Sequence, residues 1–467
     1  MAVLDRIYAI FWGPATLAVI IGMGIFLTLR SGFAQLRLFP MAMREFFGLL
    51  RPGKRERSSF RALCTALGAT VGTGNLAGVA GGIALGGPGA IFWMWVSGLF
   101  GMAVKFSEAV LAVRYRLRNE KGDYFGGPMV MIRLGMGERF RPLAALYSVL
   151  GIVAAFGVGS ATQVNALVNA AAEAMEALQI PTFSGWEWAM GALLAVFLTI
   201  LFLGGMKRIG EAAELLVPFA SLGYMLLCMG VIVSRSENLP AAVQSIFVGA
   251  FTPQAVTGGA VSSVFRAAQT GVSRGIFSNE AGMGTAAIAH AGADVDHPVR
   301  QGLMGIMEVF LDTFVICTLT ALAILCSGEP ISYGVDDGAG LTQRCFCAVY
   351  GRWAEVAIAA FLSVFTITTI LGWGIYGAAC AQYLFGRDVW RKFVLLQAAA
   401  VVLGAGAKIG MVWRLSEIVN ILMVFPNLFA LFALSPELKR LVKSFRPEKG
   451  SGRRNYCRIG PESPAAR

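Results

Sequence analysis

The feature of this sequence that most constrains its fold is a series of apolar stretches long enough to cross a lipid bilayer. A membrane-spanning helix needs about 20 predominantly apolar residues. Eleven stretches meet that requirement, with centres near residues 20, 74, 101, 157, 196, 223, 274, 314, 368, 401 and 424. Hydrophobic residues make up 56% of the chain and charged residues 14%, against roughly 25% charged residues in soluble domains. We therefore predict an all-α polytopic membrane protein with about 11 transmembrane helices, and a soluble enzyme, a disordered chain or a nucleic-acid-binding module fits poorly.

The eight cysteines are scattered along the chain, and no two of them form a C-x-x-C pair. This usage is typical of small apolar residues in helices rather than of a disulfide framework or a zinc site. No cofactor is expected from it.

The distribution of lysine and arginine predicts the orientation in the membrane. The connections after the first and third apolar stretches and the C-terminal tail are rich in these residues, whereas residues 172–185 hold none and residues 235–258 hold only Arg235. With eleven spans every basic connection falls on one side, which the positive-inside rule identifies as the cytoplasm. We expect a multi-pass protein of the cell membrane, plasma or inner, with its N-terminus outside and its C-terminus in the cytoplasm. The net charge of +12 then mostly reflects topology, and binding of anionic lipid head groups by the tail is the alternative interpretation.

The number of spans suggests an internal repeat. Without the first span ten remain, and two sets of five must run in opposite senses because five is odd. We predict four segments: residues 1–61 as an N-terminal transmembrane helix with a basic cytoplasmic loop, 62–235 as the first five-helix repeat, 236–435 as the second, inverted repeat, and 436–467 as a basic cytoplasmic tail.

The leading span of each predicted repeat contains too much glycine to form a good continuous helix. Residues 66–87 hold eight glycines, and residues 264–291 hold four together with many polar residues. Each glycine costs about 1 kcal/mol relative to alanine in a helix interior. Paired glycine-interrupted spans at matching positions of two halves predict the binding site of a transporter, because unwound backbone at membrane depth must line a cavity or be buried. Close helix packing is the alternative explanation, and we favour it for Gly81, Gly82, Gly86 and Gly87.

Several motifs resemble those of the alanine or glycine:cation symporter family, whose members include sodium:alanine symporters. The run Arg274-Gly275-Ile276-Phe277-Ser278-Asn279-Glu280-Ala281-Gly282 is the most specific. Others are Val71-Gly72-Thr73-Gly74-Asn75-Leu76-Ala77-Gly78, Gly126-Gly127-Pro128-Met129, Thr369-Ile370-Leu371-Gly372-Trp373 and Pro426-Asn427. The resemblance covers nearly the whole chain and implies the LeuT-type five-plus-five inverted repeat with one additional N-terminal helix and two broken helices. Residues 159–165 keep the family's glutamine, Gln163, but lose its usual neighbours, and Arg266 is also unusual.

The resemblance also implies a sodium site made by the backbone carbonyls of Gly68 and Val71 opposite the hydroxyls of Thr368 and Thr369. Hydroxyls that bond back to their own helix are the alternative role for these threonines. An amino-acid zwitterion needs donors for its carboxylate, which the backbone N–H groups of Thr73 and Gly74 could supply at the start of a half-helix. The expected polar partners and apolar walls of the substrate are Asn75, Gln163 and Asn279, with Phe277 and Trp373.

Trp373 is predicted to limit the size of the substrate side chain, since overpacking of a tight site is costly. Helix–helix packing is the alternative role for this residue. Its position near the middle of the ninth predicted span argues against a place in an interfacial aromatic belt.

Charged residues inside predicted spans are functional candidates by default. We expect mutual or interfacial pairing for Lys105 with Glu108 and for Glu211 with Glu214. Glu280 and Arg274 either brace the broken segment or act in gating. Glu308 and Asp312, four residues apart on one helix face, form a structural pair, carry protons, or hold Arg266 in place.

These observations predict a secondary active transporter and not an enzyme: sodium-coupled symport of a small neutral amino acid, alanine or glycine, by alternating access. The expected partners are the amino acid, the sodium ion and the bilayer. Proton-coupled transport of another small neutral solute on the same fold, through Glu308 or Asp312, and an amino-acid-sensing membrane protein are the alternatives. A channel is disfavoured because no repeated filter sequence is visible, and a sensor would be expected to carry a large soluble output domain.

Overall fold

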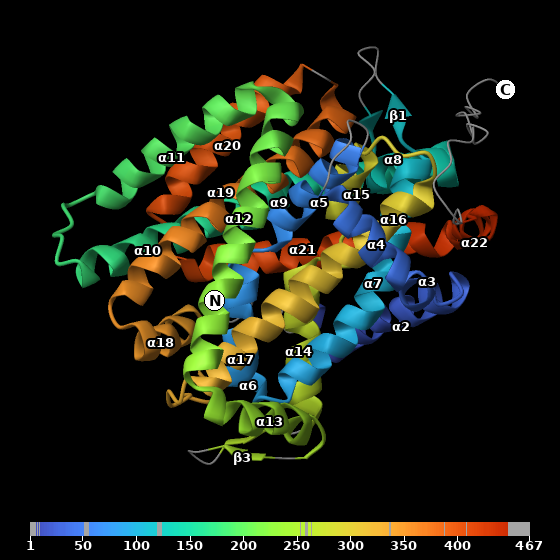
Figure 1. The fold of residues 1–467 in the computed structure, drawn as a ribbon. Coiled ribbons are helices and arrows are strands. Elements are labelled where there is room, and N and C mark those ends of the chain that lie inside the picture. Colours follow the sequence, from blue (N-terminus) through green and yellow to red (C-terminus); the bar gives the residue numbers. More distant parts are fainter. Residues whose placement is uncertain are drawn as a thin grey trace.

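The computed structural model describes residues 6, 8, 10–50, 56–118, 124–252, 254–256, 260–262, 264–335, 338–386, 388–407 and 409–446. Its described part is almost entirely helical, with two short antiparallel strand pairs at its periphery (Figure 1). Each of the four predicted segments includes residues outside the described ones, among them 51–55 of the first, 119–123 of the second, 257–259 of the third and 447–467 of the last. The boundaries of these segments therefore stay predictions.

The N-terminal part consists of one long helix and two short ones, followed by a broken helix and a long straight one. Gly89 precedes the long helix, and a Cβ atom on it would lie 2.1 Å from the Gly249 carbonyl carbon, so only glycine fits. The elements up to that point are α2 (Pro14–Arg30), α3 (Ala34–Arg37), α4 (Phe39–Leu49), α5 (Glu56–Thr70), η1 (Gly74–Gly78), α6 (Val79–Gly86) and α7 (Ala90–Arg114).

The chain then forms a strand pair, a short helix and three long helical segments. These elements are β1 (Leu117–Arg118), β2 (Tyr124–Phe125), α8 (Pro128–Met136), η2 (Glu138–Phe140), α9 (Arg141–Phe156), η3 (Gly157–Ala161), α10 (Thr162–Ala177), α11 (Trp186–Leu203) and α12 (Gly205–Ser234). Helix α12 exposes Leu215, Phe219, Leu222 and Leu226, each more than half accessible. Because these residues recur at helical spacing, they form an apolar stripe of the kind that faces lipid.

The second half begins with a peripheral helix and strand pair and again contains a broken helix. Its elements are η4 (Ser236–Asn238), α13 (Leu239–Phe251), β3 (Gln254–Val256), β4 (Ala260–Ser262), α14 (Val264–Asn279), α15 (Thr285–Ala291), α16 (Pro298–Val309), η5 (Phe310–Cys317), α17 (Thr318–Cys326), α18 (Gly338–Tyr350), α19 (Trp353–Phe385), α20 (Val389–Ala405), α21 (Ile409–Ala433) and α22 (Ser435–Ser444). Strand β1 pairs with β2 and β3 with β4, each antiparallel and with Leu117 opposite Phe125 in the first pair.

Seven helices of the described chain are long and apolar enough to cross a membrane singly, and a bent pair raises the number to as many as eight. The bent pair is residues 57–70 with 74–86, whose axes differ by 54°. Helix α2 is apolar but only 17 residues long. The protein is thus a multi-pass membrane protein, while the predicted total of eleven spans and the inverted repeat stay predictions.

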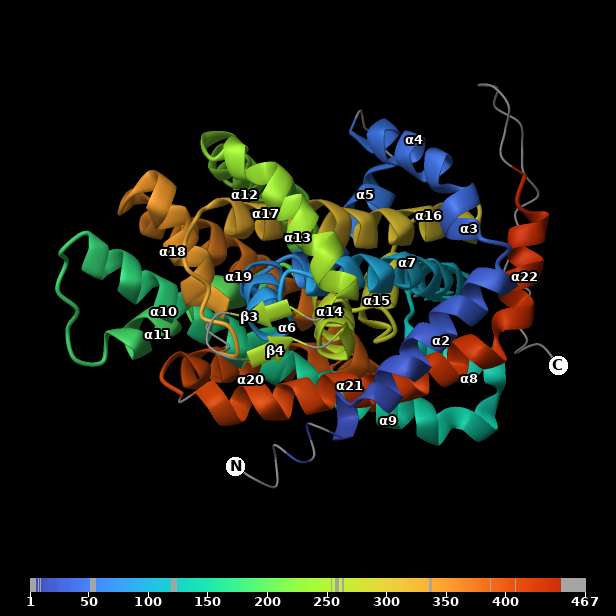
Figure 2. The same cartoon turned by 90° about the horizontal axis from the view of Figure 1, so that it is seen from below.

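The two glycine-rich segments are both interrupted. The first break, at residues 71–73, lies between α5 and η1, and the second, at residues 280–284, lies between α14 and α15. In the second break Glu280, Gly282 and Gly284 have φ angles of 53°, 96° and 77°. This left-handed conformation favours glycine and is uncommon for glutamate. Both breaks lie inside the helix bundle, where α5, α14 and α15 pass between α7, α16 and α19 (Figures 1 and 2).

Three helical segments of the interior contain π-helical turns: η1, η3 and η5. Such turns are rare and occur frequently at functional sites, because the inserted residue alters the direction of neighbouring side chains. The segment η1 carries Gly74 and Asn75, η3 ends two residues before Gln163, and η5 carries Asp312. Each of the three π-helical segments therefore contains or adjoins a residue that the sequence analysis predicts to be functional.

Candidate functional site

The first break places backbone groups of α5 beside a threonine of α19. The hydroxyl of Thr369 donates a hydrogen bond to the Gly68 carbonyl at 3.0 Å, and a Cβ on Gly72 would lie 3.1 Å from Thr369 Oγ1. Val71 is buried and its N–H donates to the Leu67 carbonyl at 2.7 Å. The structure thus brings Gly68 and Gly72 against Thr369.

Thr368 also lies close to Gly68, but its hydroxyl has a different hydrogen-bond partner from that of Thr369. Its backbone carbonyl and Cβ lie close to Gly68, since a Cβ on Gly68 would be 3.6 Å and 3.3 Å from them. Its hydroxyl donates to the Phe365 carbonyl of its own helix at 2.9 Å, as buried threonines often do. Of the two predicted threonine hydroxyls, therefore, only that of Thr369 contacts the carbonyls of the break in this conformation.

The start of η1 meets the end of α14. A Cβ on Gly74 would lie 3.4 Å from the Ser278 Cα and 3.7 Å from Phe277 Cδ1. Thr73 precedes η1, and its hydroxyl accepts a hydrogen bond from Gln163 Nε2 at 3.5 Å. Gln163 Oε1 is buried and has no hydrogen-bond partner among the described residues. Four of the seven predicted substrate-site residues, Thr73, Gly74, Gln163 and Phe277, are thus linked by direct contacts.

The unpartnered oxygen of Gln163 is chemically informative. A buried polar atom without a hydrogen bond costs free energy, and such an atom calls for a ligand or water as its partner. An amide oxygen accepts hydrogen bonds, as the ammonium group of an amino acid would require. The Gln163 amide lies next to Thr73 at the first break. The ammonium group of a bound amino acid could therefore reach this oxygen.

Asn75 and Asn279 use their amides to hold the breaks together. Asn75 Oδ1 accepts the Gly72 N–H at 2.8 Å, and Asn75 Nδ2 donates to Asp312 Oδ1 at 2.7 Å. Asn279 Oδ1 accepts the Ala281 N–H at 3.0 Å, and its Nδ2 donates to Thr313 Oγ1 at 3.1 Å. Sequence reasoning placed both side chains on the substrate, whereas the structure directs them to the backbone of their own breaks and to η5.

Trp373 is completely buried, and its ring nitrogen donates to Glu280 Oε1 at 3.1 Å. A Cβ on Gly159 would lie 2.3 Å from the Trp373 Cβ, so glycine at position 159 allows η3 to approach the tryptophan. The ring also forms an edge contact with Tyr376 at 5.8 Å between centroids. Trp373 therefore connects α19 with η3 and with the second break.

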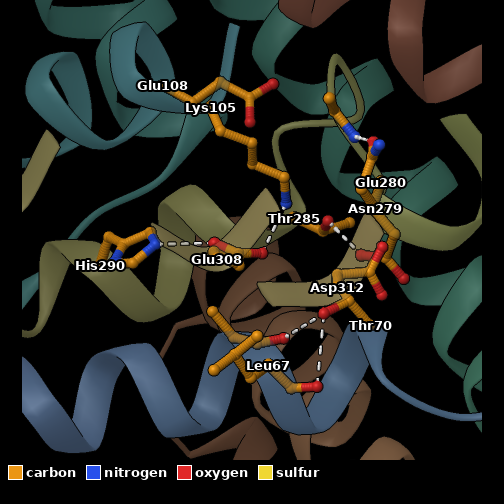
Figure 3. Close-up of polar contacts among 12 residues, drawn as sticks. Leu67, Thr70, Lys105, Glu108, Asn279, Glu280, Thr285, His290, Glu308 and Asp312 are labelled. Atoms are coloured by element: carbon orange, nitrogen blue, oxygen red, sulfur yellow. Dashed lines mark hydrogen bonds and ion pairs between the residues drawn. The ribbon is translucent and has the colours of Figure 1, made fainter. Parts of the chain in front are cut away.

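Two carboxylates stabilise the second break. Glu108 Oε1 accepts hydrogen bonds from the N–H groups of Gly282 and Gly284 at 3.0 Å and 3.2 Å, and from Asn427 Nδ2 at 2.7 Å. Glu280 Oε2 accepts the hydroxyl of Thr285 at 2.6 Å (Figure 3). Because these N–H groups lie at the start of α15, the negative charge of Glu108 also suits the positive end of that helix.

The basic partners of the acidic residues differ from those expected. Arg274, which was expected to brace the broken segment or to act in gating, lies 4.0 Å from Glu417 on α21. Lys105 pairs with Glu308 on α16 at 2.9 Å and not with Glu108 on its own helix. The physical reason is that the long lysine side chain reaches the neighbouring helix, while Glu108 is directed to the break. Glu211 and Glu214 both pair with Arg61, at 3.5 Å and 3.4 Å.

The Lys105–Glu308 ion pair is the centre of a fully buried polar network. His290 Nε2 lies 2.9 Å from Glu308 Oε2 (Figure 3). Gln301 Nε2 lies 2.7 Å from His290 Nδ1. Ser59 in turn donates to Gln301 Oε1 at 2.6 Å. The network connects α5, α7, α15 and α16, so it ties both interrupted segments to the straight helices around them.

Asp312 does not pair with Glu308. Its carboxylate accepts hydrogen bonds from Asn75 Nδ2, from Ser278 Oγ at 2.9 Å and from Thr313 Oγ1 at 2.9 Å. Among the described residues, no basic side chain forms an ion pair with it. Sequence reasoning missed Ser278, although it lies within the most specific motif, because its role appears only once α14, η1 and η5 are packed together.

Nearly the whole chain is similar in sequence to known transport proteins. Residues 1–458 match the model of the sodium:alanine symporter family. The chain is 38% identical over 451 residues to the "Sodium/alanine symporter AgcS" of Methanococcus maripaludis, covering 95% of this chain and 97% of that protein. It is 36% identical over 454 residues to the "Probable sodium/glutamine symporter GlnT" of Bacillus subtilis, covering 95% and 90%.

The fold is also similar to a solved structure, that of MhsT in complex with L-phenylalanine. The TM-score is 0.57 at 12% identity, and the match covers 82% of this chain and 97% of that one. At this identity the similarity concerns the fold alone, which is LeuT-like.

Proposed function

The chain belongs to the sodium:alanine symporter family, and from that premise we propose that it carries a small neutral amino acid, alanine or glycine, together with sodium by alternating access. The family match makes it a transporter rather than an enzyme. The observation that carries the finer proposal is the meeting of the two breaks, where Gly74 lies against Phe277 and Ser278. Unwound backbone from two interrupted helices is the arrangement that transporters use to bind substrate and ion together.

The topology that we propose has eleven spans. Helix α2 is the additional span, the elements from α5 to α12 form one five-span repeat, and those from α14 to α21 form the second, inverted one. The basic connections face the cytoplasm of a cell membrane, with the N-terminus outside. The LeuT-like fold and the positive-inside pattern support this arrangement.

In the proposed substrate site, the N–H groups of Thr73 and Gly74 bind the carboxylate of the amino acid, and the unpartnered oxygen of Gln163 accepts its ammonium group. Phe277 and Trp373 limit the space for the side chain. Asn75 and Asn279 support the two breaks through the hydrogen bonds described above, so we assign them to positioning rather than to direct contact.

In the proposed cation site, the carbonyls of Gly68 and Val71 and the hydroxyls of Thr368 and Thr369 surround sodium. Sodium is a hard cation that prefers oxygen ligands, as calcium and magnesium do, and these four groups offer oxygen without a fixed charge. The Thr369 hydroxyl already contacts the Gly68 carbonyl, whereas Thr368 would have to turn its hydroxyl away from Phe365.

The experiment that tests the function is uptake of labelled alanine by proteoliposomes containing the full chain. An inward sodium gradient should drive accumulation above the external concentration, and replacement of sodium by choline should abolish it. An inside-negative potential should increase uptake, since each charge gains about 2.3 kcal/mol per 100 mV. Absence of alanine uptake under every gradient would contradict the proposal.

Proton coupling is the second candidate, and one observation bears on it. Glu308 is neutralised by Lys105, so of the two carboxylates on this helix Asp312 is the one that could carry a proton. A pH gradient in the same proteoliposomes, without sodium, distinguishes the two coupling ions. Accumulation that needs the pH gradient and ignores sodium would favour the proton.

We predict that Thr369→Ala raises the sodium concentration for half-maximal alanine uptake by roughly fivefold, because one ligand worth about 1 kcal/mol is lost. Thr369→Ser keeps the hydroxyl and should behave like the wild type. Thr368→Ala should have a smaller effect, since its hydroxyl bonds to its own helix. Unchanged sodium dependence in both alanine variants would refute the cation site.

We predict that Trp373→Ala admits larger side chains, so that unlabelled leucine competes with labelled alanine. Overpacking against the ring is expected to cost about 1–3 kcal/mol, which corresponds to roughly 5- to 150-fold discrimination. Trp373→Phe is the matched control, because it keeps an aromatic wall while it loses the hydrogen bond to Glu280 and only part of the ring volume. A Trp373→Ala variant that transports alanine well and still ignores leucine would show that this residue is not the size gate.

A further inference from the structure

A pocket of about 650 Å³ lies at the end of α2, away from the proposed transport site. Four basic side chains line it: Arg30 at the end of α2, Arg37 at the end of α3, and Lys439 and Lys443 on α22. No carboxylate is among the described residues that line it. Helix α22 lies beside α2 and α3 in both views of the fold (Figures 1 and 2), so residues about 400 positions apart in the sequence form one basic cavity.

These four cations have no acidic partner among the described residues. On the same helix α22, Arg440 pairs with Glu437 at 3.3 Å, and Arg114 of α7 pairs with that glutamate at 2.9 Å. The only acidic residue of α22 is therefore used outside the pocket. Like charges that converge without counter-ions repel one another, so the cavity is electrostatically suited to an anion.

Arg30 supplies a second, independent observation. Its Nε atom is buried and has no hydrogen-bond partner in the part of the chain that the structure describes. A buried donor on a cationic group is costly to leave unsatisfied, and an unexplained one indicates a bound water or ion. Because Arg30 lines the pocket, an anion bound there would lie close to this donor.

The surroundings indicate what kind of anion fits. Leu29 lines the pocket and is 62% exposed, and Leu38, Val442 and Phe445 are further apolar residues of its lining. Helix α22 buries Leu438 and Leu441 against the protein and presents its lysines outward, which is typical of a helix that lies in the membrane interface. The pocket therefore combines basic and apolar lining residues at the end of a predicted span.

We propose that this pocket binds a phosphate group, supplied by the head group of an anionic phospholipid whose acyl chains lie along Leu29. Arginine matches phosphate oxygens with two parallel hydrogen bonds, and lysine adds compact positive charge. Basic pockets beside spanning helices on the cytoplasmic side are known to take such head groups. Lipid binding at this site does not depend on alanine or sodium. A test of the site can therefore fail without contradicting the proposed function, and the reverse also holds.

The test is lipid binding to the purified, delipidated full-length chain in detergent, followed by native mass spectrometry. Phosphatidylglycerol and phosphatidylcholine are titrated in separate arms, and inorganic phosphate in a third arm. The variant is Lys439→Gln/Lys443→Gln, two exposed positions whose change leaves the core intact. The charge-matched control is Lys207→Gln/Arg208→Gln at the start of α12, two exposed residues on the same predicted face.

We expect the wild type and the control to bind phosphatidylglycerol far more tightly than phosphatidylcholine. The Lys439→Gln/Lys443→Gln variant should bind it about 30-fold more weakly, or about 2 kcal/mol. In a second outcome, the wild type binds inorganic phosphate, the variant does not, and neither lipid is preferred. This result would keep the phosphate site and identify a soluble anion as its occupant. The proposal would be overturned if the wild type bound the two lipids equally and did not bind phosphate. It would also be overturned if the variant and the control lost the same amount of phosphatidylglycerol affinity.

Discussion

Lys105→Met is expected to lower the free energy of unfolding by about 3–5 kcal/mol, because it leaves the Glu308 carboxylate buried without its cation. Both side chains of the pair are completely buried and 2.9 Å apart. Stabilities of folded proteins are typically about 5–15 kcal/mol, so this loss is a large fraction of the total. Thermal unfolding of the purified protein in detergent measures it.

Two matched variants separate loss of charge pairing from loss of packing. Lys105→Met/Glu308→Leu removes both charges and keeps the volume, and it should recover most of the lost stability, since a buried pair replaced by apolar groups is often neutral. Arg133→Gln breaks the exposed Arg133–Glu138 pair and should cost about 0–1 kcal/mol. A single variant Lys105→Met that unfolds at the wild-type temperature would contradict the expected role of the pair.

Gly74→Leu is expected to abolish alanine binding while the protein remains folded. A Cβ at this position would already touch Ser278 and the Phe277 ring at 3.4 Å and 3.7 Å. The three further carbons of leucine must then occupy the space between the two breaks, where we place the substrate. Binding of labelled alanine to purified protein measures the loss, and a single symmetric peak in size-exclusion chromatography shows that the fold persists.

Gly74→Ala is the matched control for this prediction. Its single methyl group meets its neighbours at ordinary van der Waals distance, so binding should be weakened but retained. The variant also reduces backbone freedom in the same way as leucine, which leaves side-chain volume as the difference between the two. Full alanine binding by Gly74→Leu would disprove the substrate site that we propose.

Much of the fold followed from local properties of the sequence. The apolar stretches predicted a polytopic helical membrane protein because each helix satisfies its own backbone hydrogen bonds in lipid. The glycines predicted the two interruptions because their cost in a helix is local, and Gly282 indeed has a positive φ. The contact of Gly68 with Thr369 was implied by the family resemblance. Short helices between the spans, such as α13 and α18, were not predicted, since they lack the length of a transmembrane pattern.

The choice of partner for each polar side chain was not available from the sequence. Lys105 and Glu308 are 203 positions apart, and both had nearer candidates along the chain. Asn75 was placed on the substrate, yet the folded chain brings Asp312 within 2.7 Å of it. A helical pattern specifies which residues share a face, but not which helix that face will meet.

The sequence by itself thus determined the class of protein, the family, the helical character of the chain and the positions of the two breaks, because these depend on residues within a few turns of one another. Only the tertiary structure decided that Glu108 holds the second break and that Asp312 has no ion-pair partner among the described residues. It alone brought Arg30 and Lys443 into one pocket. The physical reason is that burial removes water as a competing partner, so every buried polar group takes whatever the packing of distant helices places within reach.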